Sequence, residues 1–246
     1  MERYSDYDDF AQTYNRHWGS FATHILPVLD QLALSDFPTG TAILDLCCGT
    51  GQLARELTGR GYKVTGVEGS EQMLQYARRN APEATFSNAD ARFFDLPVDF
   101  ALVFSTYDSL NHLLTLADLS KVFRNVYNHL QTGGFFVFDM NLDSGFRSRW
   151  AGTFQIVSES SVVVVDSTYD EDEKLATMNI TSFSQNQDDN TLWRRNDIVL
   201  TQRAYSVDEL TKALASAGFT DTEVFDARRD FGWREEGRAF FRARKA

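Results

Sequence analysis

The stretch ILDLCCGTGQLARELTGRGYKVTGVEGSEQM at 43–73 constrains the fold more than any other part of the sequence. One apolar run leads into the Gly-x-Gly turn at 49–51, a segment with helical spacing follows, and Glu68 ends a second apolar run. A strand, a glycine turn, a helix and a second strand that ends in an acid form the nucleotide-binding unit of open α/β sheets. The stretch therefore predicts a nucleotide-binding site at the end of the first strand.

Apolar runs continue to alternate with helical patterns as far as residue 140, which is typical of a parallel sheet covered by helices. Right-handed crossovers would join the strands. Ser70 and Asp118 are of the residue types that suit helix N-caps. The predicted strands are 42–46, 63–68, 84–90, 100–106 and 133–140.

The pattern changes near residue 150 to long segments of period two. Three such segments, separated by the polar turns DEDE and NQDDN, occupy 153–204 and predict a three-stranded antiparallel meander with one wet face. A helix that ends at Gly218 follows, and then a closing antiparallel pair, 220–227 with 238–245. The expected fold is α/β: a doubly wound, mostly parallel seven-stranded sheet that carries the meander as an antiparallel insertion.

Composition and charge exclude several classes of function. The net charge of −11 repels polyanions, so no nucleic-acid partner is expected, and the basic residues of 228–245 are expected on the solvated face of an edge strand. No apolar run approaches the roughly 20 residues that cross a bilayer, and the first ten residues do not resemble a signal peptide. The adjacent pair Cys47 and Cys48 fits a reducing compartment, and the four histidines lack metal-ligand spacing. We expect a cytoplasmic protein without membrane or metal.

Asp45 indicates which nucleotide the site takes. Gly49 to Ala54 match G-x-G-x-x-A, and Glu68 stands near the position where an acid binds the ribose of NAD. A pyrophosphate over the glycine turn would, however, lie close to the negative charge of Asp45. S-adenosylmethionine carries a sulfonium and an ammonium there, so an acid at the strand end offsets positive charge. Asp45 therefore favours S-adenosylmethionine.

The motif D-L-C-C-G-T-G at 45–51 resembles the first motif of class I S-adenosylmethionine-dependent methyltransferases. YDDFAQTYNRHW (7–18), FSTYDSLNHLL (104–114) and HLQTGGFFVFDMN (129–141) resemble the small-molecule group of that superfamily, which includes sugar N-methyltransferases and uncharacterised bacterial proteins. The resemblance implies a Rossmann-like fold, S-adenosyl-L-methionine as cofactor, S-adenosyl-L-homocysteine as product and a small-molecule acceptor. We expect a monomer or a homodimer.

The resemblance also implies the cofactor site. It places the methionine end against 47–51 with Asp45 facing the amino group, the ribose hydroxyls on Glu68, and the adenine against Met73. Met73 could equally be helix packing, and Asp90 could be a chain turn. The aromatic stripe that includes Tyr14 and Trp18 could be core or cofactor lid. The expected cofactor residues are Tyr14, Trp18, Asp45, Cys47, Gly49, Gly51, Glu68, Gly69, Met73, Asp90, Ala91 and Ser105.

Polar residues at 105–112 follow the fourth predicted strand, at the edge of the sheet where ligand crevices lie. His112 could be a general base or a buried, hydrogen-bonded histidine. Asp108 is expected to act as a helix N-cap rather than as a base. Polar side chains that could contact the methyl acceptor are those of Tyr107, Asn111 and His112. The catalytic candidates among them are His112 and Tyr107.

The expected reaction is an in-line displacement, in which the substrate attacks the methyl group and a neutral thioether leaves; it requires no obligatory base. The expected domains are 1–150 with 205–246, including a helical cap over about 1–40, and the insertion 151–204. The insertion is expected to roof the acceptor pocket or, alternatively, to form a dimer interface. Two rival functions remain at this point, an NAD-dependent oxidoreductase and a non-catalytic protein that binds S-adenosylmethionine.

Overall fold

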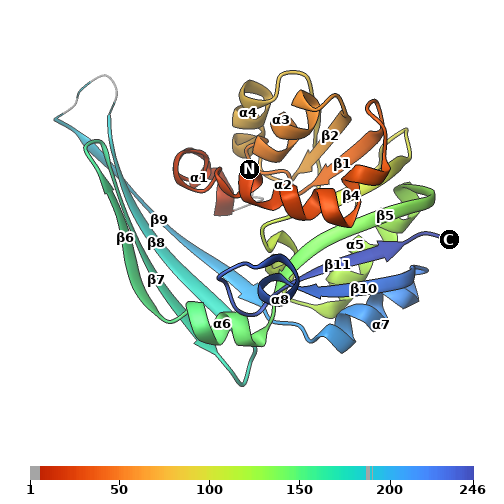
Figure 1. Ribbon diagram of the computed structural model, residues 1–246. Coiled ribbons are helices and arrows are strands. Elements are labelled where there is room, and N and C mark those ends of the chain that lie inside the picture. Colours follow the sequence, from red (N-terminus) through yellow and green to blue (C-terminus); the bar gives the residue numbers. More distant parts are fainter. Residues whose placement is uncertain (1–5, 187–188, 190) are drawn as a thin grey trace.

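A seven-stranded sheet forms the body of the computed structural model, which describes residues 6–186, 189 and 191–246 (Figure 1). The first five residues and part of the turn expected at 186–190 lie outside the described residues. The strand order is β10-β11-β5-β4-β1-β2-β3, in which β1 to β5 are parallel and β11 runs antiparallel to both β5 and β10. The strands are β1 (Ala42–Leu46), β2 (Lys63–Glu68), β3 (Thr85–Asn88), β4 (Phe100–Ser105), β5 (Leu130–Asn141), β10 (Thr220–Asp226) and β11 (Arg238–Arg244). The doubly wound, mostly parallel sheet predicted from the sequence is confirmed.

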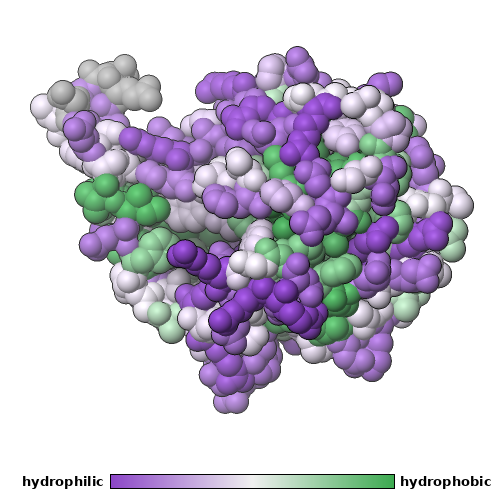
Figure 2. Space-filling view, in the orientation of Figure 1, coloured by the Kyte–Doolittle hydropathy of each residue, from purple (hydrophilic) through white to green (hydrophobic). Residues whose placement is uncertain are grey.

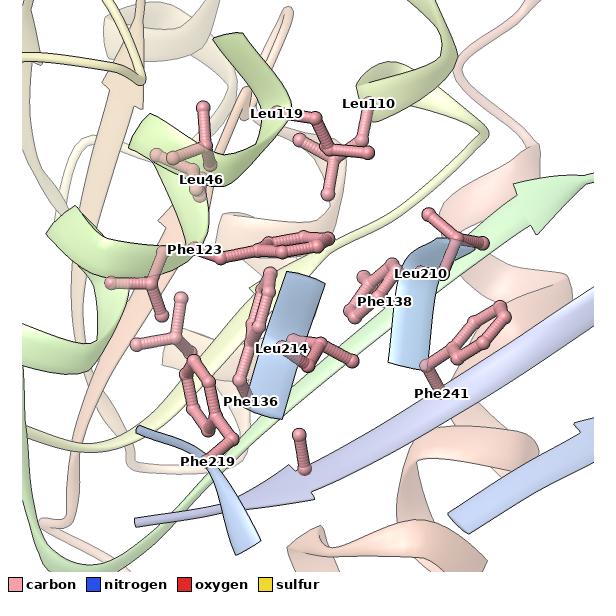
Figure 3. Close-up of a cluster of buried hydrophobic side chains, with 14 of the residues drawn as sticks. Leu46, Leu110, Leu119, Phe123, Phe136, Phe138, Leu210, Leu214, Phe219 and Phe241 are labelled. Carbon is pink, nitrogen blue, oxygen red and sulfur yellow. The ribbon is translucent and has the colours of Figure 1, made fainter. Parts of the chain in front are cut away.

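Helices cover both faces of this sheet. They are α2 (Phe21–Leu32), α3 (Gln52–Gly59), α4 (Glu71–Asn80), α5 (Leu116–His129), α7 (Val207–Ala217) and α8 (Ala227–Phe231), with 3₁₀ turns η2 (Leu34–Asp36) and η3 (Ser109–His112). α5 and α7 pack phenylalanines and leucines against one face (Figure 3). α2, α3 and α8 pack on the other, because successive residues of β1, such as Ile43 and Leu44, point to opposite faces. Among the described residues no helix has the length and apolar character that crossing a membrane requires.

A second sheet extends from the body as a curved arm (Figure 1). It follows α6 (Asp143–Arg149) and consists of β6 (Gly152–Ser158), β7 (Ser161–Asp170), β8 (Leu175–Gln185) and β9 (Trp193–Arg203), antiparallel in that order. We call these four strands the meander. The prediction of three strands is wrong, because Ser158 pairs with Ser161 and a two-residue turn divides the first segment. Glu159 and Ser160 lack the Asn-Gly signature that usually marks such a turn.

The N-terminal segment lies between the body and the meander (Figure 1). It consists of η1 (Asp6–Asp8) and α1 (Ala11–His17). Phe10 is buried against Val163, Val165 and Ile180 of the meander, whereas the hydroxyl of Ser70 in the body donates to Asp8 at 2.6 Å. The N-terminal segment therefore joins both parts of the molecule.

The helix caps test the sequence interpretation at single residues. Ser70 caps α4 by accepting from the amide of Met73, and Gly218 ends α7 at a φ of 109°, so both predictions are confirmed. Asp118 is not a cap: the hydroxyl of Thr115 accepts the amide of Asp118 at 3.1 Å, which makes Thr115 the N-cap of α5. A threonine three residues before an acid is itself a recognised N-terminal signal.

Candidate active site

The loop after β1 turns sharply at three residues. Cys47, Gly49 and Gly51 have φ angles of 59°, 54° and 79°, a region that favours glycine. Gly51 also begins α3, and a Cβ atom on it would lie 2.8 Å from the Cα of Ala77 on α4. A Cβ on Gly49 would lie 3.5 Å from the ring of Tyr14. α1 therefore holds the Tyr14 ring against the glycine loop.

Asp45 is buried near the end of β1, with 2% of its surface exposed. Its Oδ2 atom has no hydrogen-bond partner among the described residues. Burial and the nearby Glu68 raise the pKa of Asp45 to about 8, against the opposing effect of the Ala54 backbone amide. Asp45 lines a small cavity together with Tyr14, Cys47 and other residues. A buried carboxylate oxygen without a partner suits an ammonium group, such as that of S-adenosylmethionine, and opposes a pyrophosphate.

Glu68 ends β2 beside the same loop. Its two carboxylate oxygens accept hydrogen bonds from the backbone amides of Gly49, at 3.1 Å, and Ser70, at 2.9 Å. Burial raises the pKa of Glu68, while these backbone hydrogen bonds lower it. Each oxygen retains a second lone pair, so a ribose diol could still donate to both oxygens.

A larger cavity of about 650 Å³ begins at Glu68 and contains the expected adenine side. Met73 lines it and is also 1% exposed, so this residue is packed in the structure, and its contact with the adenine stays a prediction. Asp90 also serves two purposes: it accepts from the backbone amide of Arg92 at 2.8 Å, which makes a turn, and it lines the cavity. Ala91 and Gly69 line the cavity beside them.

The two cavities meet at shared lining residues. Both are lined by Tyr14, Trp18, Cys47 and Tyr107. These residues therefore lie between the small cavity, where the methionine end of the cofactor is expected, and the larger cavity. Gly51 and Ser105, expected at the cofactor, line neither cavity. Gly51 acts instead at the contact of α3 with α4, as described above.

Tyr107 and Asp108 follow β4 in an unusual conformation, with φ angles of 65° and 49°. Such angles are strained for residues other than glycine. The carboxylate of Asp139, on β5, accepts the amide of Tyr107 at 2.6 Å and that of Asp108 at 3.0 Å. The ring of Tyr107 stacks on Phe21, with centroids 4.0 Å apart. Asp139 and Phe21 thus hold this turn in place.

Asp108 does not cap a helix, contrary to expectation: its side chain makes no capping hydrogen bond to η3. Its carboxylate instead accepts from Arg238 at 2.8 Å and from Gln202 at 2.7 Å. Arg238 also pairs with Asp139 and, at 3.1 Å, with Glu235. These carboxylates raise the pKa of Arg238 although burial opposes them.

The prediction that the basic residues of the C-terminal tail lie on the solvated face of an edge strand is wrong for Arg238. This residue is 3% exposed. β11 lies between β10 and β5 rather than at the edge of the sheet, so both of its edges are paired, and its residues are buried except Arg242 and Arg244. Arg244, at its end, is exposed. The buried Arg238 brings the last strand into the candidate site.

His112 ends η3 and lines the larger cavity. Its Nδ1 lies 3.0 Å from the backbone oxygen of Thr201, and its Nε2 lies 2.9 Å from the Tyr7 hydroxyl and 3.1 Å from the side-chain nitrogen of Gln202. His112 is therefore hydrogen-bonded and half-buried beside the cavity, and its role as a general base stays a prediction. No group of three or more metal-ligating residues occurs in the part of the chain that the structure describes.

Asn111, a candidate for contact with the methyl acceptor, makes hydrogen bonds that connect parts of the structure. Its amide group donates to the backbone oxygens of Asn141, at 3.0 Å, and Arg203, at 2.7 Å, and accepts from the amide of Asn141 at 2.9 Å. These hydrogen bonds connect η3 to β5 and to the end of the meander. Asn111 is fully buried and does not line the larger cavity.

Sequence reasoning missed several residues of this site. Asp139 carried a signal, since an acid within the apolar run GGFFVFDMN must find buried partners. Gln202 carried none, because a glutamine in an alternating strand is ordinary until the other strands show which face is covered. The missed residues that line the larger cavity include Tyr7, Asn141, Arg149, Gln202, Glu235 and Arg238.

Comparisons with known proteins find methyltransferases. Residues 43–134 match a family described as a methyltransferase domain. YqeM of Bacillus subtilis (strain 168), which bears a methyltransferase name, is 29% identical over 230 residues, covering 86% of this chain and 87% of the relative. A dTDP-3-amino-3,4,6-trideoxy-alpha-D-glucopyranose N,N-dimethyltransferase of Streptomyces venezuelae is 35% identical over 103 residues, which cover 42% of this chain and 44% of that relative. The chain thus matches less than half of that enzyme's length.

Solved structures share the whole fold. A S-adenosylmethionine-dependent methyltransferase from Clostridium acetobutylicum ATCC 824 superposes with a TM-score of 0.78 at 22% identity, over 98% of this chain and 99% of that one. The amino pentose methyltransferase CalS10 from Micromonospora echinaspora, solved with S-adenosylmethionine bound, gives a TM-score of 0.71 at 23% identity, over 100% and 99%. At such identities the likeness concerns the fold, meander included.

Proposed function

Given that the chain is a class I S-adenosylmethionine-dependent methyltransferase of the small-molecule group, we propose that it methylates an amino nitrogen of its acceptor. The N,N-dimethyltransferases among its relatives act on amino sugars, as their names state, and an amino sugar is the acceptor class that we propose here. Neither an oxidoreductase nor a non-catalytic binding protein is favoured by the comparisons.

The proposed cofactor contacts follow from the fit of the site to S-adenosylmethionine. Asp45 would bind the ammonium group, Glu68 the ribose diol, and Met73 with Ala91 the adenine. When bound, the cofactor supplies an electrophilic methyl group on a sulfonium. Tyr14 would cover the junction between the cavities and exclude water from it. The protein's own task is to orient the acceptor and to remove a proton.

The observation that carries the amine proposal is the orientation of His112. Its Nδ1 faces a carbonyl oxygen, which can only accept, so in the neutral ring Nε2 is free of a proton and can take one. An amine that attacks the methyl group forms a bond to carbon through its lone pair while the carbon–sulfur bond breaks. The resulting ammonium then releases its proton to Nε2.

The insertion 151–204 is proposed to roof the acceptor space. Met178, Ile180 and Leu200 of the meander line the larger cavity opposite the body, which supports this role. A dimer interface on the meander is the competing proposal. Sedimentation measurements of the molecular mass distinguish the two, because the roof requires only one chain.

The test is a methyl-transfer assay with the purified full-length chain. S-adenosylhomocysteine formation would be measured against a panel of amino sugars, simple amines and the matching hydroxyl analogues. We expect turnover with amino sugars, with the new methyl group on nitrogen by mass spectrometry. Turnover of a hydroxyl analogue in preference to its amine would contradict the proposal.

A further inference from the structure

The hydrogen bonds of His112 fit only one charge state of its ring. The backbone oxygen of Thr201 at 3.0 Å fixes the proton on Nδ1. The side-chain nitrogen of Gln202, 3.1 Å from Nε2, can only donate. A second ring proton, carried by Nε2, would face the N–H group of Gln202, and two donors cannot form a hydrogen bond with each other. The hydroxyl of Tyr7 can donate or accept, so it suits either state.

The amide of Gln202 is itself held in one orientation. Its nitrogen also donates to Asp108 at 2.7 Å, and a reversed amide would set its oxygen against that carboxylate. The other oxygen of Asp108 accepts from Arg238 at 2.8 Å, and Arg238 pairs in turn with Asp139. All four of these residues are at most 7% exposed, so their hydrogen bonds are largely shielded from water.

We propose that Gln202, oriented by Asp108 and the buried pair Arg238–Asp139, is a positioning residue that holds His112 in its neutral Nδ1–H form, and that its amide nitrogen leaves Nε2 when this atom accepts the proton of the acceptor nitrogen. The proton-accepting role rests on the proposed function. The hydrogen-bond arrangement does not, because it concerns the protein alone.

Groups around the His112 ring include Tyr7 from η1 and Thr201 and Gln202 from β9, and Gln202 connects the ring to Asp108 at the start of η3. Without the Gln202 amide, Nε2 loses a donor that favours the neutral ring, and the carboxylate of Asp108 loses the donor that lies between it and the ring. Both changes favour the imidazolium, so their effects add.

Histidine ¹⁵N NMR of the full-length chain tests the proposal without any acceptor. We expect the Nδ1–H tautomer of His112 in the wild type, and in Gln202→Met a rise of about one pH unit in its titration midpoint. The neighbouring Thr201→Val retains the backbone oxygen and serves as the matched control, and His17, His24 and His129 serve as internal references. An Nε2–H tautomer in the wild type, or an unchanged midpoint in a folded Gln202→Met, would overturn the proposal.

An Nε2–H tautomer in the wild type would overturn the proposal even if Gln202→Met does not fold, because Nε2 could then not accept from Gln202. Once an acceptor is known, the acid limb of the kcat/KM profile should move upward by the same amount in Gln202→Met, while the Kd of S-adenosylhomocysteine stays within about two-fold. A merely structural role for Gln202 would lower stability without moving that limb. An absence of amine methylation would refute the proposed function and leave the NMR result standing.

Discussion

Glu68, the last residue of β2, accepts the backbone amide of Gly49 from the loop after β1 at 3.1 Å. The acid and the glycine turn that constrain the fold in the sequence are thus directly bonded to each other. Because the carboxylate holds the loop that is proposed to face the cofactor, its removal would affect both the proposed ribose contact and the shape of the loop.

Substitution of Glu68 by alanine is therefore expected to weaken S-adenosylmethionine binding by roughly 10- to 100-fold, since charge-assisted hydrogen bonds are worth about 1.5–3 kcal/mol. Titration calorimetry measures the change. Glu68→Gln is the matched variant: it keeps the size and one acceptor oxygen, so it should fall between the wild type and Glu68→Ala. Equal affinities in all three proteins would mean that other groups hold the ribose.

Asp45→Asn should separate stability from binding. The folded protein keeps a proton on Asp45 up to about pH 8, whereas the unfolded chain loses it near pH 4, so the free energy of unfolding falls as pH rises across that window. We expect Asp45→Asn to exceed the wild type in stability by at least about 1 kcal/mol at pH 8, and by progressively less toward pH 5. Urea unfolding at several pH values tests this.

The same substitution should weaken S-adenosylmethionine binding at least about tenfold, because the ammonium loses its carboxylate. 5′-Methylthioadenosine, which lacks the amino-acid group, is the control ligand and should bind both proteins alike. A variant that binds S-adenosylmethionine as well as the wild type would place the ammonium elsewhere.

Gly51→Ala is expected to destabilise the protein by roughly 1–3 kcal/mol. The φ of 79° strains any side chain, and the new Cβ would meet α4 at Ala77. Gly59→Ala is the matched control within α3, since a Cβ there meets nothing within 4 Å and alanine favours the helix. Thermal unfolding should rank Gly51→Ala below and Gly59→Ala at or above the wild type; a reversed order would contradict the packing argument.

Leu200→Ala tests the proposed roof. Leu200 lines the larger cavity, whereas its neighbour Val199 is 50% exposed on the outer face of the meander. We expect Leu200→Ala to raise the KM of the acceptor about tenfold, by loss of apolar contact, and to leave the Kd of the cofactor within about two-fold. Val199→Ala should change neither. A loss of cofactor affinity alone in Leu200→Ala would place the methyl-accepting space elsewhere.

Features of the fold and site that depend on residues close together in the chain could be predicted from the sequence, whereas features that depend on distant strands could not. The order 42–68 of strand, turn, helix and strand is local, and Asp45, Gly49 and Glu68 meet as expected. The Arg238–Asp139 pair was missed because it depends on β11 inserting beside β5, a pairing across 99 positions of the chain. The turn at 159–160 was missed because its residues are compatible with a continuous strand.

The meander displays alternate residues on its two faces: Met178, Ile180, Leu200 and Gln202 line the cavity, and Val199 is exposed on the other face. Figure 2 shows exposed apolar side chains on the part of the surface that the meander forms. Neighbouring residues of a meander strand therefore lie on different surfaces, one toward the cavity and one away from it. If the meander roofs the acceptor as proposed, substitution of a residue that faces the cavity would change which acceptor binds, and substitution of a residue on the other face would change only the outer surface. Selection could change the substrate without disturbing any external association, and could change the association without disturbing the substrate, while the cofactor loop stays as it is.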